Sequence, residues 1–392
     1  MNLTDQMLVA MVVILALPYL VWRLGRTEAW APLVVVQILM GIALGPGLLG
    51  AAFPTQHAAL FSPEVLLMLT GIAHWGVILF VWLAGLELDL TDAWRERRDG
   101  VVTASCALLF PLTLGALVGA ALLQLDGAWM GEAAEPWQFA VGIGMASSVT
   151  ALPILMLFMR KLEILSTPLG QRVLRYASLD DIAIWAVLAL IILDFNGLMR
   201  QGAFLVLFIV ASWALRQWMP KLPATDRWFV TLIWLPFIAF VADWAGLHFM
   251  VGAFLAGAVM DRAWFNLKML DQMRELVLLT LMPVFFLSTG LKTQWDIGQF
   301  GVLWVAIILL VSAVAGKWLG VQVASHWLRW PKGQANLVAW LLQTKALIMI
   351  IFANILLDKA IISAEMFTSL LLMAALSTLL TIPMATRAKA KL

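Results

Sequence analysis

Asp180 and Asp181 are adjacent carboxylates at the head of the apolar stretch "DDIAIWAVLALIIL". Two lysines, Lys317 and Lys345, also lie inside hydrophobic stretches. If these stretches cross a membrane, each buried ionisable group costs about 2.5 to 3.5 kcal/mol on insertion scales, and such groups usually mark an ion path or a proton relay. A carboxylate that binds either a proton or a hard monovalent cation, but not both at once, is a minimal exchange site.

Two acids and two bases at membrane depth predict that opposite charges pair. Neighbouring residues on a helix point about 100° apart, so Asp180 and Asp181 cannot both face one ligand squarely. One acid can therefore meet a lysine while the other faces a water-filled cavity. A purely structural network of buried ion pairs is the alternative, although helices can be held together without its desolvation cost.

Two of the hydrophobic stretches contain polar interruptions near their middle. In "GIGMASSVTALPILMLF", Ser148 and Thr150 lie just before Pro153, which removes a backbone donor and disrupts the preceding turn. In "NLVAWLLQTKALIMIIF", Lys345 lies in the interruption. Broken helices supply carbonyls and helix ends at the midplane, and a lysine there can neutralise the end of an opposing helix. A simple proline kink is the alternative for the first stretch.

The composition predicts the elements that position these residues. The chain has 392 residues, of which 63% are hydrophobic and 12% charged, whereas soluble domains carry about 25% charged residues. A membrane-crossing helix needs about 20 apolar residues. The sequence therefore predicts an all-α polytopic membrane protein with about thirteen transmembrane helices, near 5–22, 31–50, 63–86, 101–123, 137–159, 176–193, 201–218, 228–243, 247–260, 273–291, 299–325, 334–357 and 363–384.

The basic residues predict the orientation of these spans. With the N-terminus outside, twenty of the 25 lysines and arginines fall in inner loops or the C-terminal tail, three in outer loops and two inside spans. Cytoplasmic loops carry such an excess, so we expect a cytoplasmic C-terminus. The first span lacks a preceding basic region, so we expect it to be retained, not cleaved. Seven spans separate the fifth from the twelfth, so the two interrupted spans run in opposite directions, as in an inverted repeat.

Two other classes of protein use similar residues. Paired aspartates also hold Mg²⁺ for intramembrane prenyl or phosphoryl transfer, but "DDIAIWA" has no further acid at helical spacing. A solute symporter or channel is the closer alternative, because fold alone does not settle the mode of transport. The predicted loops are short, so we expect no soluble catalytic domain, no enzyme activity, no cofactor and no nucleic-acid partner.

Seven segments, in order, carry a resemblance to a known family: "GIALGPGLLG", "FVWLAGLELDL", "SSVTALPIL", "SLDDIAIW", "GAFLAGAVM", "MPVFFLSTGLK" and "GKWLG". They resemble the second branch of the monovalent cation:proton antiporter superfamily, which contains bacterial Na⁺/H⁺ antiporters and the membrane parts of Kef-type potassium efflux proteins. Two departures stand out. This chain has Lys345 and Ala346 where the branch often has Arg and Gly. It also lacks the nucleotide-binding tail of Kef-type members, which counts against gated potassium efflux.

The resemblance implies a role for each candidate residue. Asp181 would carry the monovalent cation and the proton in turn. Asp180 would pair with Lys317 and release it when the cation binds. Thr150 and Ser148 would lie at the crossing of the broken helices and lend oxygens. An Asp at the first position of the pair accompanies electrogenic exchange in this family.

The resemblance also implies a domain organisation and a setting. Exchange of Na⁺ or Li⁺ for protons by alternating access in a homodimer of the bacterial inner membrane is expected, with K⁺/H⁺ exchange as the alternative. A core domain would move against a dimerisation domain. The predicted division is residues 1–100 (dimerisation helices), 101–195 (core half with Asp180 and Asp181), 196–298 (linker and dimerisation helices) and 299–392 (core half with Lys317 and Lys345).

Overall fold

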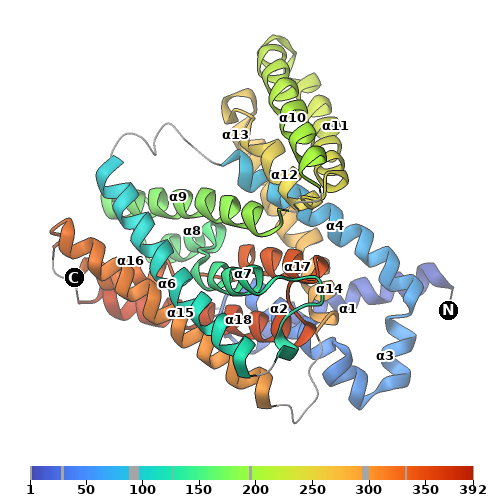
Figure 1. The fold of residues 1–392 in the computed structure, drawn as a ribbon. Coiled ribbons are helices and arrows are strands. Elements are labelled where there is room, and N and C mark those ends of the chain that lie inside the picture. Colours follow the sequence, from blue (N-terminus) through green and yellow to red (C-terminus); the bar gives the residue numbers. More distant parts are fainter. Residues whose placement is uncertain are drawn as a thin grey trace. The chain divides into compact units, whose positions relative to one another are not determined.

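The computed structural model describes residues 2–27, 31–87, 97–125, 127–193, 197–293, 300–331 and 333–391. This part of the chain is almost entirely helical (Figure 1). Its one isolated β-bridge joins Met130 to Ile362. Arg95 and Lys332, which we counted with the inner loops, lie outside the described residues.

Ten described helical stretches are long and apolar enough to cross a membrane. They are α1 (Leu3–Leu24), α2 with η2 (Leu33–Leu44 and Pro46–Gly50), α4 (Pro63–Leu86), α6 (Arg97–Leu125), α7 with α8 (Pro136–Ser148 and Leu152–Lys161), α10 (Leu198–Trp218), α11 (Ala224–Trp244), α13 with η7 and α14 (Leu267–Leu276, Val277–Leu281 and Met282–Leu291), α15 (Phe300–Trp327) and α18 (Ala364–Lys389). Each coincides with a predicted span.

The three remaining predicted spans also contain helices. They hold α9 (Pro168–Ile191), α12 (Phe249–Ala258) and the pair α16 and α17 (Gln334–Leu341 and Ile348–Asp358). A short helix that the sequence did not predict, α3 (Pro54–Leu60), follows η2. The fold class is therefore confirmed as an all-α polytopic membrane protein.

Local sequence signals fix the helix ends. The Ser62 hydroxyl accepts the Val65 N–H at the start of α4, where a proline follows the cap, and the Ser363 hydroxyl accepts the Met366 N–H at the start of α18. Both are ordinary N-caps, which satisfy backbone donors that have no partner inside the helix. Between α11 and α12, Gly246 and His248 have φ of 88° and 90°, and this reversal separates the two helices as predicted.

One compact unit comprises Met1–Met11, Phe61–Leu88 and Ile192–Ser288. Within it α4 and α12 touch through their backbones, because a Cβ at Gly85 would overlap the Phe254 carbonyl and a Cβ at Gly257 would overlap the Trp82 carbonyl. Small residues allow such close approach of membrane helices. Two of the family segments, "FVWLAGLELDL" and "GAFLAGAVM", thus pack on each other.

An ion pair in the same unit joins Glu87, at the end of α4, to Arg274 of α13. Burial raises the pKa of the Glu87 carboxyl, although the cationic side chains of Arg274 and Arg262 oppose that shift. The pair therefore ties α4 to α13 just beyond the apolar part of α4.

The second unit comprises Val12–Leu60, Asp89–Ile191 and Thr289–Leu392, and it contains every candidate site residue. Its helices α6 and α15 are in backbone contact, because a Cβ at Gly316 would overlap Pro111 and one at Gly320 would overlap the Cys106 carbonyl. These glycines flank Lys317 in "GKWLG", so the motif brings this lysine close to α6. Residues 12–60 belong to this unit, although we grouped them with the dimerisation helices. The assignment of core and dimerisation domains stays a prediction.

Candidate ion-binding site

Two helices of the second unit are interrupted, and their interruptions touch. The first break, between α7 and α8, spans residues 149–151, and the second, between α16 and α17, spans residues 342–347. The Ala151 N–H donates to the Thr344 carbonyl at 2.6 Å. The interrupted helices expected from the sequence are therefore present and cross at their breaks.

Side chains from neighbouring segments satisfy the unwound backbone. The Thr150 hydroxyl lies 2.9 Å from the Leu342 carbonyl, and the Ser377 hydroxyl of α18 donates to the Gln343 carbonyl at 2.9 Å. The Ala346 N–H donates to the Thr378 hydroxyl at 3.1 Å. A membrane interior offers no water to replace these bonds, so the crossing depends on the hydroxyls of Thr150 in the first break and of Ser377 and Thr378 in α18.

The backbone of the second break turns at Leu347, not at Ala346. Leu347 has φ of 85° and ψ of −77°, a conformation that costs energy for a residue with a branched side chain. The side chain is completely buried, and its packing holds the turn. The break thus forms without the glycine that the branch often has after its basic residue.

Lys317 pairs with the first aspartate. Its Nζ lies 2.8 Å from Asp180 Oδ2 and 2.6 Å from the Ser148 carbonyl at the end of α7. The Thr150 hydroxyl lies 2.6 Å from the same Asp180 oxygen. Because Lys317 is 0% exposed and Asp180 2%, this is a fully buried ion pair in which each charged group contacts the other in place of water.

Lys345 occupies the other side of the same helix end. Its Nζ donates to the Ser147 carbonyl at 2.5 Å and to the Val149 carbonyl at 3.3 Å. Carbonyls at a helix C-terminus lack partners inside the helix and carry partial negative charge. The two lysines therefore bind three consecutive carbonyls at the end of α7, in the place where a cation would otherwise be needed.

The remaining groups of the site show where an ion could be held. Asp181 is 7% exposed and lies next to the paired Asp180 in α9. Among the described residues, Asp180 Oδ1 is buried and has no hydrogen-bond partner, which is unusual for a carboxylate. The Ser148 hydroxyl donates to the Met145 carbonyl of its own helix, so Ser148 contributes its carbonyl and not its hydroxyl to the crossing.

A cluster around Asp99 anchors one end of α9. Arg172 donates to both Asp99 oxygens, at 3.2 and 3.1 Å, and the Tyr176 hydroxyl donates to Asp99 as well. The Trp330 indole, from the segment after α15, donates to Asp99 at 3.1 Å, and its ring stacks on Tyr176. Arg172 and Tyr176 precede Asp180 by eight and four residues, so the three lie along one face of α9.

The sequence predicted all six candidate residues, and the structure places them in one unit. Asp180, Lys317 and Thr150 are in direct contact, and Lys345 and Ser148 meet the end of α7 beside them. Sequence reasoning missed the Asp99 cluster. The spacing of Arg172 and Tyr176 ahead of the acid pair was the available signal, but nothing in it identified Asp99 or Trp330 as partners.

Comparisons with known proteins point to one family. The family model described as "Sodium/hydrogen exchanger, transmembrane" matches residues 8–387. The Na(+)/H(+) antiporter NhaS4 of Synechocystis is 29% identical over 371 residues, which cover 90% of this chain and 90% of the relative. Cation/H(+) antiporter 17 of Arabidopsis thaliana is also 29% identical over 371 residues, covering 90% of this chain and 45% of the relative, so this chain spans about half of that protein.

A solved structure has the same fold. The sodium proton antiporter MjNhaP1 from Methanocaldococcus jannaschii superposes with a TM-score of 0.64 and 14% identity, covering 100% of this chain and 96% of the other. At this level of identity the likeness concerns the fold alone. It agrees with the arrangement of helices expected from the sequence.

Proposed function

This chain belongs to the sodium/hydrogen exchanger family, a family of membrane transporters and not of enzymes, and we propose that it is an electrogenic antiporter of Na⁺ or Li⁺ and protons. Its relatives are named as Na⁺/H⁺ and cation/H⁺ antiporters. The site residues, the ion and the electrical character of the exchange are part of the proposal.

The observation that carries the proposal is the buried acid pair at the crossing of two broken helices. Asp181 binds either the cation or a proton, because a protonated carboxyl group no longer carries the negative charge that attracts a cation. Asp180, whose Oδ1 has no hydrogen-bond partner among the described residues, supplies a second carboxylate to the cation. Thr150, whose hydroxyl lies 2.6 Å from Asp180 Oδ2, offers a neutral oxygen of the kind that a partly dehydrated cation needs.

The ion pair with Lys317 makes this exchange electrogenic. When a cation binds both acids, Asp180 releases Lys317, and the lysine can lose its proton. The site then holds two carboxylates and one cation, with net charge −1. In the proton-loaded state Asp181 is protonated and Asp180 pairs with Lys317⁺, with net charge zero. The two loaded states differ by one charge, so each cycle moves one charge across the membrane.

K⁺/H⁺ exchange is the second candidate function. The Arabidopsis relative is named only as a cation/H⁺ antiporter, and the same carboxylates bind any hard monovalent cation. Selection among cations depends on the size of the hydrated cavity and the number of oxygens that reach the ion.

The setting of the antiporter is also proposed. The division of basic residues supports an N-terminus outside and a C-terminus in the cytoplasm, and we propose a bacterial inner membrane as the setting. A homodimer would hold one set of helices still while the unit that contains the acid pair moves against it.

Proteoliposomes that enclose a pH-sensitive dye test the proposal. After a proton gradient is formed, Na⁺, Li⁺ and K⁺ are added separately, and dye recovery reports exchange. We expect recovery at lower concentrations of Na⁺ or Li⁺ than of K⁺, and a faster rate when a membrane potential of favourable sign is imposed. Recovery with K⁺ alone would select the second candidate, and no recovery with any of the three would refute both.

A further inference from the structure

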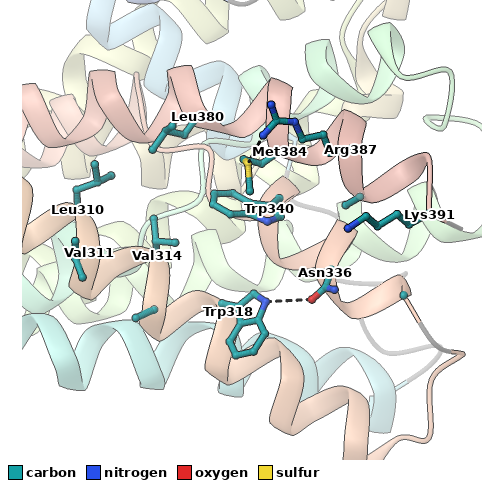
Figure 2. Close-up of a pocket in the computed structure, with 13 residues that line it drawn as sticks. Leu310, Val311, Val314, Trp318, Asn336, Trp340, Leu380, Met384, Arg387 and Lys391 are labelled. Atoms are coloured by element: carbon teal, nitrogen blue, oxygen red, sulfur yellow. Dashed lines mark hydrogen bonds between the residues drawn. The ribbon is translucent and has the colours of Figure 1, made fainter.

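A groove on the second unit lies apart from the acid pair. Segments of α15, α16 and α18 line it, and its volume is about 870 Å³ (Figure 2). Pockets that bind small molecules usually have volumes of about 300 to 1,000 Å³. The groove is thus large enough to bind a small molecule.

One end of the groove is apolar. Leu310, Val311 and Val314 of α15 line it together with Leu380 of α18 (Figure 2). Val311 is 61% exposed and Leu380 42%, so these side chains face outward from a helix bundle that crosses a membrane. Hydrocarbon is the partner that such a surface fits.

The other end carries positive charge. Arg387, in the last turn of α18, and Lys391, two residues after that helix ends, lie there with Asn336 from the first turn of α16 (Figure 2). The N-cap of α16, Gly333, provides no side-chain cap, so this helix end adds partial positive charge. No acidic residue lines the groove, and neither basic side chain forms an ion pair within the described part of the chain.

We propose that this groove binds an anionic phospholipid from the leaflet at which α18 ends. The phosphate of the lipid bonds to Arg387 and Lys391, and an acyl chain runs along Val311, Val314 and Leu380. A free phosphate would leave the apolar end empty, and a zwitterionic lipid would bring its own cation to the basic end. Only an anionic lipid matches both ends of the groove.

The position of the groove gives the lipid a structural role. Trp340 lines it from α16, one residue before that helix ends at the crossing. On α18, Ser377 and Thr378 bond the unwound backbone of the crossing, and Leu380 follows them closely. A bound lipid therefore packs against the two helices that hold the second break, and it stabilises the folded protein by mass action.

Native mass spectrometry of the detergent-solubilised protein tests this, with phosphatidylglycerol or phosphatidylcholine as the titrated lipid. We expect phosphatidylglycerol to bind more tightly. The double variant R387Q/K391Q should lose roughly five-fold in affinity per cation removed. Lys389→Gln is the matched control, because Lys389 lies on the same helix but donates to the Leu162 carbonyl at 2.6 Å, outside the groove.

A second variant separates a lipid site from a merely basic surface. Val314→Trp fills the apolar end and leaves Arg387 and Lys391 in place. It should weaken phosphatidylglycerol binding and abolish the rise in melting temperature that this lipid produces. Equal binding of both lipids, unchanged binding in R387Q/K391Q, or unchanged binding in Val314→Trp would each overturn the proposal. A disulfide between two copies of the variant Trp318→Cys would also overturn the proposal, since the groove would then be an interface between proteins.

Discussion

Replacing Lys317 by Gln removes the positive charge from the buried ion pair and keeps a hydrogen-bond donor on a side chain one bond shorter. The Ser148 carbonyl can still accept a bond from the amide, so the principal loss is the charge opposite Asp180. Asp180 would then hold a proton throughout the transport cycle, since an unpaired carboxylate is costly in this setting. Exchange through Asp181 alone moves no net charge.

The magnitude follows from burial. Lys317 is 0% exposed and Asp180 2%, and their charged atoms are 2.8 Å apart. Removing one partner of a buried pair costs about 3 to 5 kcal/mol. Because protonation of Asp180 relieves part of this cost, we expect a loss near the lower limit, about 3 kcal/mol of unfolding free energy at neutral pH.

Lys345→Gln provides the matched comparison. Lys345 is equally buried and also bonds to carbonyls at the end of α7, but its hydrogen bonds go to Ser147 and Val149 and not to a carboxylate. A hydrogen bond contributes about 0.5 to 1.5 kcal/mol net to stability, and the amide restores part of the two that Lys345 makes. This variant should lose about 1 kcal/mol and retain exchange that depends on the membrane potential.

The assay combines unfolding in detergent with dye recovery in proteoliposomes under imposed potentials. Lys317→Gln should melt at a lower temperature than Lys345→Gln and show a rate that is independent of potential. If Lys317→Gln keeps both its melting temperature and its potential dependence, while Lys345→Gln loses them, the assignment is wrong and Lys345 is the functional partner of the acid pair.

Four further predictions concern other parts of the molecule. Asp181→Asn should fold normally but abolish dye recovery, because an amide neither binds a proton near pH 7 nor offsets a cation; wild-type rates would refute its role as carrier. Gly320→Ala should lower the free energy of unfolding by about 1 to 3 kcal/mol, because the added methyl group separates α6 from α15. Gly202→Ala should not, because Gly202 has open space around it. Equal melting curves for the two variants would contradict this packing. Asp99→Asn should raise the cation concentration for half-maximal exchange. Glu87→Gln, which breaks an ion pair in the other unit, should change stability alone. If both variants raise that concentration equally, Asp99 has no positioning role. A reporter fused after the last residue should be cytoplasmic, and a periplasmic signal would overturn the orientation.

Much of the fold was predictable because a helix that crosses the hydrocarbon core of a membrane needs about 20 mostly apolar residues. Each predicted span contains a described helix, and the predicted boundary between 243 and 247 does separate α11 from α12. Charges at membrane depth are rare for the same reason, so Asp180, Asp181, Lys317 and Lys345 were visible without any structure. The short helix α3 was missed, since it has only 7 residues and follows a span directly.

The partners of these residues were much less predictable. Ser148 contributes a carbonyl because its hydroxyl bonds to Met145 in the preceding turn, and no sequence pattern states which oxygen faces a site. The turn in the second break falls at Leu347, where burial of the side chain offsets the backbone strain. Asp99 and Trp330 are 231 residues apart, and contacts of this kind depend on how helices are placed in space.

The two lysines explain why cation and proton would share one place in this protein. A half-helix that ends inside a membrane exposes carbonyls, and a transported cation is the simplest partner for them. Here Lys317 and Lys345 already bond to the carbonyls of Ser147, Ser148 and Val149. In the proposed exchange, an incoming cation would find the end of α7 occupied and would be held by carboxylates, which are also the groups that bind protons. Competition between the two ions would follow from this occupancy, and the ion pair of Lys317 with Asp180 would connect that competition to the movement of charge.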